Sequence, residues 1–251
     1  MMMNEAWKEY WHNFKTGLAF LLLLVFVLPF LYLRGFYFSS GSVFTDYDFA
    51  KLGVAELVIS LLTLLAFLFA YSVFLTLVIF AIRKRYSAVK VHYFLTEKIH
   101  KFSFKIFAYM ITLLVLAWVL GWAWLNLGLP LPWLAGAWLL ITMALMFVPQ
   151  AIVIDEQDLP GSIQKALEFS LRHKRAFAET FLIGLALTLI LVLLEFVVDY
   201  YFFVGRYAAL LLSLVFVVPY FEGLKAIQYM HKFELVRRAY GHHRLKHHKR
   251  A

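Results

Sequence analysis

The chain contains no cysteine in its 251 residues. This absence excludes disulfides and metal sites that are built from thiolates. Charged side chains are also scarce, at 16% of the sequence, whereas about a quarter of the residues in a soluble domain are charged. Hydrophobic residues make up 63% of the chain. A core that folds in water does not absorb such an excess, so the composition predicts an integral membrane protein.

The motifs of several common enzyme classes are also missing. The sequence contains no HExxH, no GxSxG, no P-loop and no GxGxxG. Serines 39, 40 and 42 fall in a predicted outer loop, but in the topology predicted below all nine histidines fall on the opposite side. A serine nucleophile there would have no histidine to activate it. The sequence therefore predicts a protein that is not an enzyme and that has no cofactor and no metal site.

Six apolar segments are long enough to cross a bilayer, which takes about 20 residues for each helix. They cover residues 16–33, 54–82, 104–126, 131–153, 179–200 and 207–224. The predicted fold is therefore all-α, a single polytopic domain with six transmembrane helices. Pro29, Pro149 and Pro219 lie inside these segments or near their ends. Each proline frees a backbone carbonyl, so local kinks are expected at all three positions.

The distribution of positive charge predicts the orientation. With six spans, 21 of the 24 lysines and arginines fall on one side, and the other side has only Arg34, Lys51 and Arg206. The positive-inside rule then places both termini in the cytoplasm, in a multi-pass protein of the cell membrane. The first segment lacks a small-residue cleavage site, so it is expected to be a retained span. The formal charge of +9 points to anionic lipid and not to nucleic acid, because the basic residues sit beside the spans.

Three amphipathic stretches precede predicted hairpins, and we expect each to form a helix at the cytoplasmic interface. The apolar faces consist of Trp7, Tyr10, Trp11, Phe14 and Leu18; of Val91, Leu95, Ile99, Phe102 and Ile106; and of Ile163, Ala166, Leu167, Ser170, Leu171 and Phe177. In the third stretch, Ile163, Leu167 and Leu171 are expected to be buried. The chain is either three tandem units of one amphipathic helix and one hairpin, or it has three unrelated juxtamembrane helices.

Residues 149–177 resemble a segment that recurs in a diffuse group of prokaryotic multi-pass membrane proteins. The group includes the membrane domain fused to some glycerophosphodiester phosphodiesterases, and uncharacterised relatives. The matching residues are Pro149, Ile152, Val153, Asp155, Glu156, Ala166, Ser170, Arg172 and Lys174. The resemblance implies a membrane module without the phosphodiesterase activity, because nothing remains outside the membrane to form a catalytic domain.

The fifth span carries a stripe of polar and small residues. Thr180, Gly184, Thr188, Glu195 and Asp199 fall within one sector of roughly 100° on a helix. A shorter stripe on the second span consists of Glu56, Ser60 and Thr63. Either the stripes are helix-packing seams whose acids pair with Arg206 or Arg34, or they line a path for a proton, a cation or a small solute.

Residues 225–251 are expected to form a cytoplasmic helix and a basic tail. Glu222 and Lys225 are three residues apart and are expected to pair. The tail carries His242, His243, His247 and His248, and it is interpreted as a solvated tail attracted to anionic headgroups in preference to a metal site. Overall the sequence favours a non-catalytic membrane module that engages lipid or a partner protein. The alternative is a small transporter or channel that uses the stripe of the fifth span.

Overall fold

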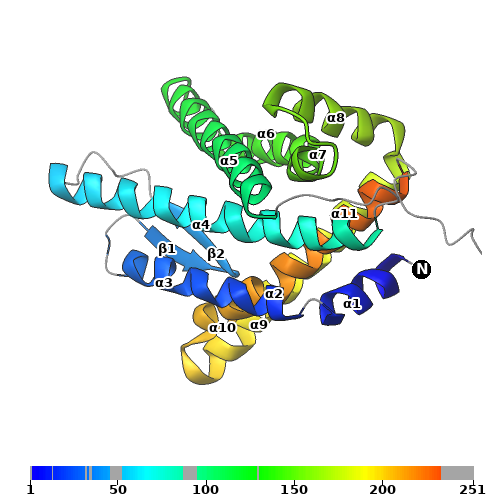
Figure 1. Cartoon of the computed structure of the whole chain (residues 1–251). Coiled ribbons are helices and arrows are strands. Elements are labelled where there is room, and N and C mark those ends of the chain that lie inside the picture. The colour runs from blue at the N-terminus through cyan, green and yellow to red at the C-terminus, as the bar shows by residue number, and fades with distance from the viewer. Residues whose placement is uncertain are drawn as a thin grey trace, which may run out of the picture.

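The computed structural model describes residues 2–12, 14–31, 33, 36–45, 53–86, 95–128 and 130–232. Almost all of these residues are helical (Figure 1). The elements are α1 (Met2–His12), α2 (Phe14–Ala19), η1 (Phe20–Leu22), α3 (Leu23–Val27), η2 (Leu28–Leu31), β1 (Phe36–Ser39), β2 (Ser42–Thr45), α4 (Val54–Tyr86), α5 (Leu95–Asn126), α6 (Leu131–Leu145), α7 (Val148–Ile154), α8 (Leu159–Arg172), α9 (Lys174–Phe202), α10 (Gly205–Leu212), the π-helix η4 (Ser213–Val217) and α11 (Val218–Lys232).

Among the described residues, five helical stretches are long and apolar enough to cross a bilayer. They are Val54–Lys84, Lys98–Asn126, Pro132–Ile154, Lys174–Phe202 and Gly205–His231. A sixth candidate is the pair Ala6–His12 and Gly17–Phe30, which is bent by 68°. The length and composition of the helices therefore support the predicted helical, multi-pass membrane architecture, with five or six candidate spans.

The three prolines sit at irregularities of the helices, as predicted. Pro29 lies in the 3-10 turn η2, Pro149 follows a break between α6 and α7, and Pro219 follows the π-helix. A proline at position i leaves the carbonyl of residue i−4 without its helical partner. In both later cases a tyrosine hydroxyl donates to that carbonyl: Tyr109 to Leu145 at 3.0 Å, and Tyr10 to Val215 at 3.0 Å.

The second predicted interfacial helix is wrong as a separate element. Helix α5 runs without a break from Leu95 to Asn126, and Phe102 and Ile106 are buried in the protein. The reason is local, since neither glycine nor proline occurs between Leu95 and Gly121 to end the helix. Val91 lies outside the described residues.

Residues 36–45 form a β-hairpin that the sequence analysis did not predict. Strand β1 pairs antiparallel with β2, and Ser39 lies opposite Ser42. The turn residues Ser40 and Gly41 both have positive φ, at 51° and 74°, as a two-residue hairpin turn requires. A Cβ on Gly41 would lie 2.6 Å from the Cβ of Ser213 and 2.9 Å from the carbonyl of Ala209. The tip of the hairpin is therefore packed against α10 and η4.

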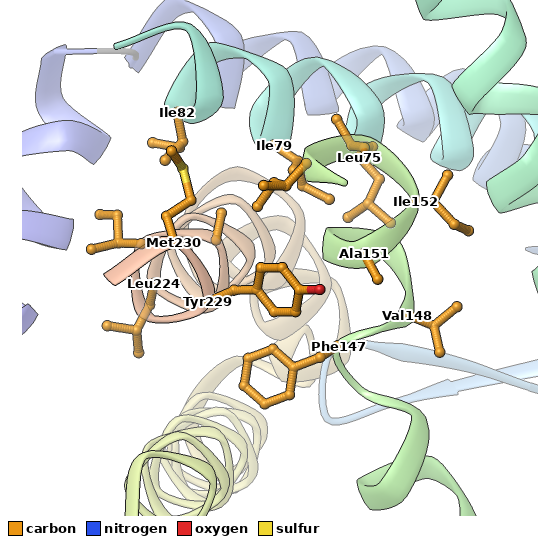
Figure 2. Packing of buried hydrophobic residues seen from close by; sticks show 14 of the residues in the cluster. Leu75, Ile79, Ile82, Phe147, Val148, Ala151, Ile152, Leu224, Tyr229 and Met230 are labelled. Atoms are coloured by element: carbon orange, nitrogen blue, oxygen red, sulfur yellow. The ribbon is translucent and has the colours of Figure 1, made fainter. Parts of the chain in front are cut away.

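Helix α7 lies at the centre of the packing. All seven of its residues are buried, and it contacts α4, α5, α8 and α11. Figure 2 shows Ala151 of α7, and Phe147 just before this helix, near Tyr229 of α11, with Ile79 of α4 on the other side of the tyrosine ring. Six of its seven residues are apolar, and such a helix is stable only when neighbours cover it. Each fully buried large apolar side chain contributes about 1.5–3 kcal/mol.

A second cluster attaches the first apolar segment to the rest of the protein. Phe20, Leu23, Val27 and Phe30 are buried against side chains from α4, α10 and η4. Helix α1 packs against α11. We refer below to the end of the bundle that carries α8 (Leu159–Arg172) as the α8 end, and to the end that carries the β-hairpin of residues 36–45 as the hairpin end.

Candidate functional site: a groove between α6 and α9

A groove of about 420 Å³ runs along the surface between α6 and α9. Its walls and floor are formed by Leu139, Thr142, Met143 and Met146 of α6 and the turn after it, by Phe181, Gly184, Leu185, Leu187 and Thr188 of α9, and by Val217 and Phe221. This volume lies within the range of about 300–1,000 Å³ that is typical of small-molecule sites.

The groove is apolar in its chemistry, although two threonines line it. Thr142 donates to the carbonyl of Trp138 at 3.0 Å, and Thr188 donates to the carbonyl of Gly184 at 3.0 Å. Both hydroxyl protons are therefore used within their own helices, and both threonines can present methyl groups to the groove. Leu139 and Leu185, on opposite walls, are 51% and 47% exposed. The groove thus opens sideways, away from the core of the bundle.

Gly184 sets the position of the floor. A Cβ at this residue would lie 2.9 Å from the Cζ of Phe221, so the absence of a side chain allows the phenyl ring to lie against α9. The other face of the floor is polar. The Lys225 ammonium lies 5.2 Å from the centroid of the Phe221 ring, a cation–π distance.

A buried polar cluster lies behind this floor, at the break between α6 and α7. Lys225 donates to the Glu222 carboxylate at 2.6 Å and to the carbonyl of Met146 at 3.1 Å. The other Glu222 oxygen accepts from the amide of Gln150 at 2.8 Å. All three side chains are buried. The predicted pairing of Glu222 with Lys225 is confirmed, and Lys225 also satisfies a carbonyl at the break. The sequence did not indicate that second role.

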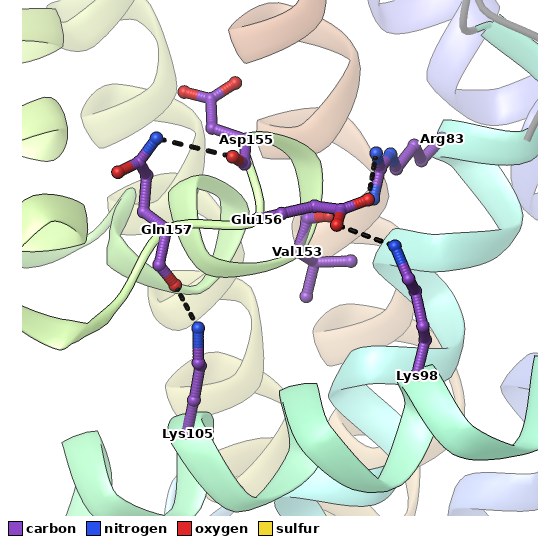
Figure 3. Close-up of polar contacts among 7 residues, drawn as sticks. All are labelled: Arg83, Lys98, Lys105, Val153, Asp155, Glu156 and Gln157. Carbon is purple, nitrogen blue, oxygen red and sulfur yellow. Dashed lines mark hydrogen bonds and ion pairs between the residues drawn. The ribbon is translucent and has the colours of Figure 1, made fainter.

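The loop between α7 and α8 is held at the α8 end by three cations (Figure 3). The Glu156 carboxylate forms ion pairs with Arg83 at 2.8 Å and with Lys98 at 2.7 Å. Arg83 also donates to the carbonyl of Val153 at 2.6 Å, and Lys105 donates to the carbonyl of Gln157 at 2.7 Å. These contacts join the loop to the neighbouring ends of α4 and α5, so the start of α8 has a fixed position.

Two adjacent carboxyl groups in this loop have opposite pKa shifts. Burial alone would raise the pKa of Glu156, but the hydrogen bonds and charges of Lys98 and Arg83 outweigh it and hold that pKa below its usual value. Burial dominates at Asp155 and raises its pKa, although the carboxylate accepts a 2.6 Å hydrogen bond from Tyr229. Glu156 is therefore held by charge, whereas Asp155 is held by packing and one hydroxyl.

Helix α8 has three faces. Ser162, Ala166 and Phe169 are buried against the protein, and Asp158 caps the helix by accepting from the N–H of Gly161 at 3.2 Å. Leu167 and Leu171 are 39% and 70% exposed. The protein itself does not cover these two leucines, because the packed face lies about 150° away from them around the helix, and their burial in a membrane stays a prediction. Ile163, as expected, packs partly against the core.

The third face of α8 is charged. Lys165, Glu168 and Arg172 lie on it, and Glu168 pairs with Lys165 at 3.8 Å and with Arg172 at 3.1 Å. The helix therefore presents an apolar row and a charged row in addition to the row that packs on the protein. This is the pattern of a helix at a boundary between lipid and water.

No protein-family model, curated protein or solved structure matches this chain. The resemblance of residues 149–177 to the phosphodiesterase-linked membrane domain therefore stays a prediction.

The stripe predicted on the fifth span is divided between separate environments. Thr180 is buried and its hydroxyl contacts the side-chain oxygen of Gln228. Gly184 and Thr188 belong to the groove. The packed part of α9 at Thr180 and the groove at Gly184 and Thr188 are thus neighbouring parts of one helix face.

The acids at the hairpin end of α9 bind backbone N–H groups. Glu195 accepts from the N–H of Ser40 at the tip of the hairpin, and Asp199 accepts from the N–H of Gly205 at 2.5 Å, at the start of α10. Arg206 is exposed and lies over the ring of Tyr207 at 4.9 Å. Within the described residues it forms no ion pair with either acid, so the pairing with Arg206 that the packing alternative offered is not formed there. Arg34 lies outside the described residues.

The shorter stripe on α4 is not brought into one extensive interface with α9. Glu56 is exposed and accepts from the N–H of Gly53 at 3.4 Å, while Ser60 is buried and Thr63 is half-buried. The main contacts of α4 are with α5, α7 and α11, and those of α9 are with α8, α10 and α11. In the described part of the chain, no three His, Asp or Glu side chains gather as a metal site would require. The histidine-rich tail lies outside that part.

Proposed function

We propose that this protein is a non-catalytic module of the cell membrane and that its groove between α6 and α9 binds the acyl chain of a lipid. The lateral opening of an apolar groove supports the proposal. In a bilayer such an opening faces hydrocarbon, and an acyl chain can enter it without removing any polar group from water. From Phe181 to Thr188 the wall extends about 10 Å, at 1.5 Å per residue.

The surroundings of the groove fit a position in a bilayer. Trp122, Trp133 and Tyr200 are more than two-thirds exposed near the hairpin end, and Trp7 and Trp11 are about half exposed at the α8 end. Aromatic residues of this kind gather at the two interfaces of a membrane. With α8 in the cytoplasmic interface, Leu167 and Leu171 face lipid and the charged row faces water.

The transport alternative has less support. Its sharpest candidates, Glu195 and Asp199, are used to hold the hairpin tip and the start of α10. Neither the groove nor the small cavity lined by Tyr10, Val78 and Pro219 joins the stripes of α4 and α9. We therefore propose binding of lipid as the function of the module.

Photo-cross-linking in vesicles tests the proposal. The protein is reconstituted in phosphatidylcholine that contains a phosphatidylcholine with a diazirine in one acyl chain. We expect labelling to be enriched at residues 139–146 and 181–188 relative to the equally exposed Val115 and Val119 of α5. The Leu185→Trp change fills the groove and should remove this enrichment, whereas Leu182→Trp, beside the groove on the same helix, should keep it. Uniform labelling of all lipid-facing helices would overturn the proposal.

The orientation is tested separately. Because the chain has no cysteine, single cysteines report one position each. In intact cells a cysteine at Gln164 should resist an impermeant thiol reagent, and one at Ser42 should react, since both positions are exposed. Reaction at Gln164 from outside the cell would reverse the proposed orientation.

A further inference from the structure

The face of α9 that lines the groove continues beyond it toward the α8 end. At 100° per residue, Lys174 falls within about 20° of Phe181 and about 40° of Thr188 around the helix axis. At 1.5 Å per residue it lies about 10 Å beyond Phe181 and about 21 Å from Thr188. Lys174 is exposed and is the first residue of α9, and only His173 separates it from the end of α8. The groove therefore has a cation in line with its wall, at the level of α8.

The basic residues beside Lys174 have acidic partners of their own. Arg175 pairs with Glu179 at 3.0 Å, and Arg172 pairs with Glu168 at 3.1 Å. No acidic side chain in the described part of the chain forms an ion pair with Lys174. Around the helix axis, Arg175 also lies about 120–140° away from the groove residues Phe181 and Thr188. The positive-inside rule accounts for cations at this level in general, but it does not account for one placed in line with the groove.

The order of chemistry along this face matches that of one lipid molecule. A cation comes first, followed by Ala178 and Phe181, and then by the groove with Leu185. A phospholipid in the cytoplasmic leaflet presents its charge, its glycerol and its acyl chain in the same order. The exposed Leu171 of α8 adds apolar surface at the junction, where the first part of the acyl chain would lie.

We infer that the groove selects an anionic phospholipid of the cytoplasmic leaflet, with its acyl chain between α6 and α9 and its headgroup phosphate on Lys174. This inference rests on the proposed function and adds the class of lipid. A zwitterionic lipid also carries a phosphate, but its own ammonium competes with Lys174. The attraction to this cation is therefore stronger for an anionic headgroup. One basic residue near a membrane surface increases the binding of an anionic lipid by about fivefold.

The test uses phosphatidylcholine vesicles with one of two probes at equal trace amounts, a diazirine-bearing phosphatidylglycerol or its phosphatidylcholine counterpart. The measured quantity is labelling of residues 139–146 and 181–188 divided by labelling at Val115 and Val119. For the natural sequence we expect this ratio to be about fivefold higher with phosphatidylglycerol, and the preference should weaken at high salt.

The variants separate a specific contact from general attraction. Lys174→Gln should abolish the preference, Lys174→Arg should retain it, and Arg175→Gln, which removes the same charge from the same turn, should leave it nearly unchanged. Equal labelling by the two probes, or a preference that survives Lys174→Gln, overturns the headgroup assignment. If both probes still label the groove above the reference positions, the proposed function stands. If neither does, the proposed function fails as well.

Discussion

The insertion of the hairpin tip can be tested by replacing Gly41 with alanine. At φ 74° an L-residue costs about 1–2 kcal/mol relative to glycine. The new methyl group would also meet the Cβ of Ser213 at 2.6 Å and the carbonyl of Ala209 at 2.9 Å. Overpacking of this kind costs about 1–3 kcal/mol. The expected loss of unfolding free energy is therefore about 2–5 kcal/mol.

Gly128 provides a matched control. It has a similar φ of 64°, but a Cβ built there has no neighbour within 4 Å. Gly128→Ala should therefore lose only the conformational part, about 1–2 kcal/mol. Unfolding of both variants in the same detergent, by denaturant titration, gives the comparison. Glu195→Leu should lower the unfolding free energy by less in a Gly41→Ala background than in the natural sequence, since both changes release the same hairpin tip. Equal losses for the two glycines would refute the insertion of the hairpin between α9 and α10.

Three further results are expected from unfolding measurements in detergent. Lys225→Met should cost about 3–5 kcal/mol because it leaves a buried carboxylate unpaired, whereas Lys84→Met at an exposed position should stay within about 0.5 kcal/mol. The pKa of Glu156 is lowered in the folded state. Its carboxylate therefore contributes fully to stability above the unfolded-state pKa of about 4.3, and this contribution is lost as the pH falls through the lower folded-state pKa. Glu156→Gln should remove this loss of stability in acid. Leu167→Glu should reduce stability more than Arg172→Ala does, since Leu167 faces lipid or detergent and Arg172 makes only an exposed ion pair; equal effects would argue against an interfacial α8.

The positions of the spans could be predicted from the sequence because they depend on hydropathy and length, which are local properties. The same holds for the irregularities at Pro149 and Pro219 and for the pairing of Glu222 with Lys225 at i,i+3. The side chains that satisfy the carbonyls freed by these prolines could not be predicted. Tyr109 and Tyr10 are among 14 tyrosines, and only the packing of α5 and α1 selects them.

The hairpin and the neighbours of two leucines on α8 were not predicted, for different reasons. The hairpin had a usable signal, since the apolar runs of residues 36–39 and 42–45 flank a two-residue Ser-Gly turn. That signal was missed because the segment was interpreted as a polar outer loop. The neighbours of Leu167 and Leu171 could not be predicted for another reason. Hydrophobic periodicity indicates an apolar face but does not distinguish a protein neighbour from a lipid one.

The acids of α9 show why the function was harder to predict than the fold. The helical period correctly placed Glu195 and Asp199 on one face, and a search for partners among charged side chains then led to Arg206. The partners that the fold supplies are backbone N–H groups, which every residue except proline carries and which sequence therefore cannot single out. Once these acids are satisfied at the hairpin end, the groove that remains on the same face is lined by ordinary residues such as Leu185 and Met143. It lies between α6 and α9, which both contact α8, and its place along the chain has no motif. A site of this kind is expected for a protein that binds a lipid chain, since hydrocarbon has no polar group that would require a distinctive residue.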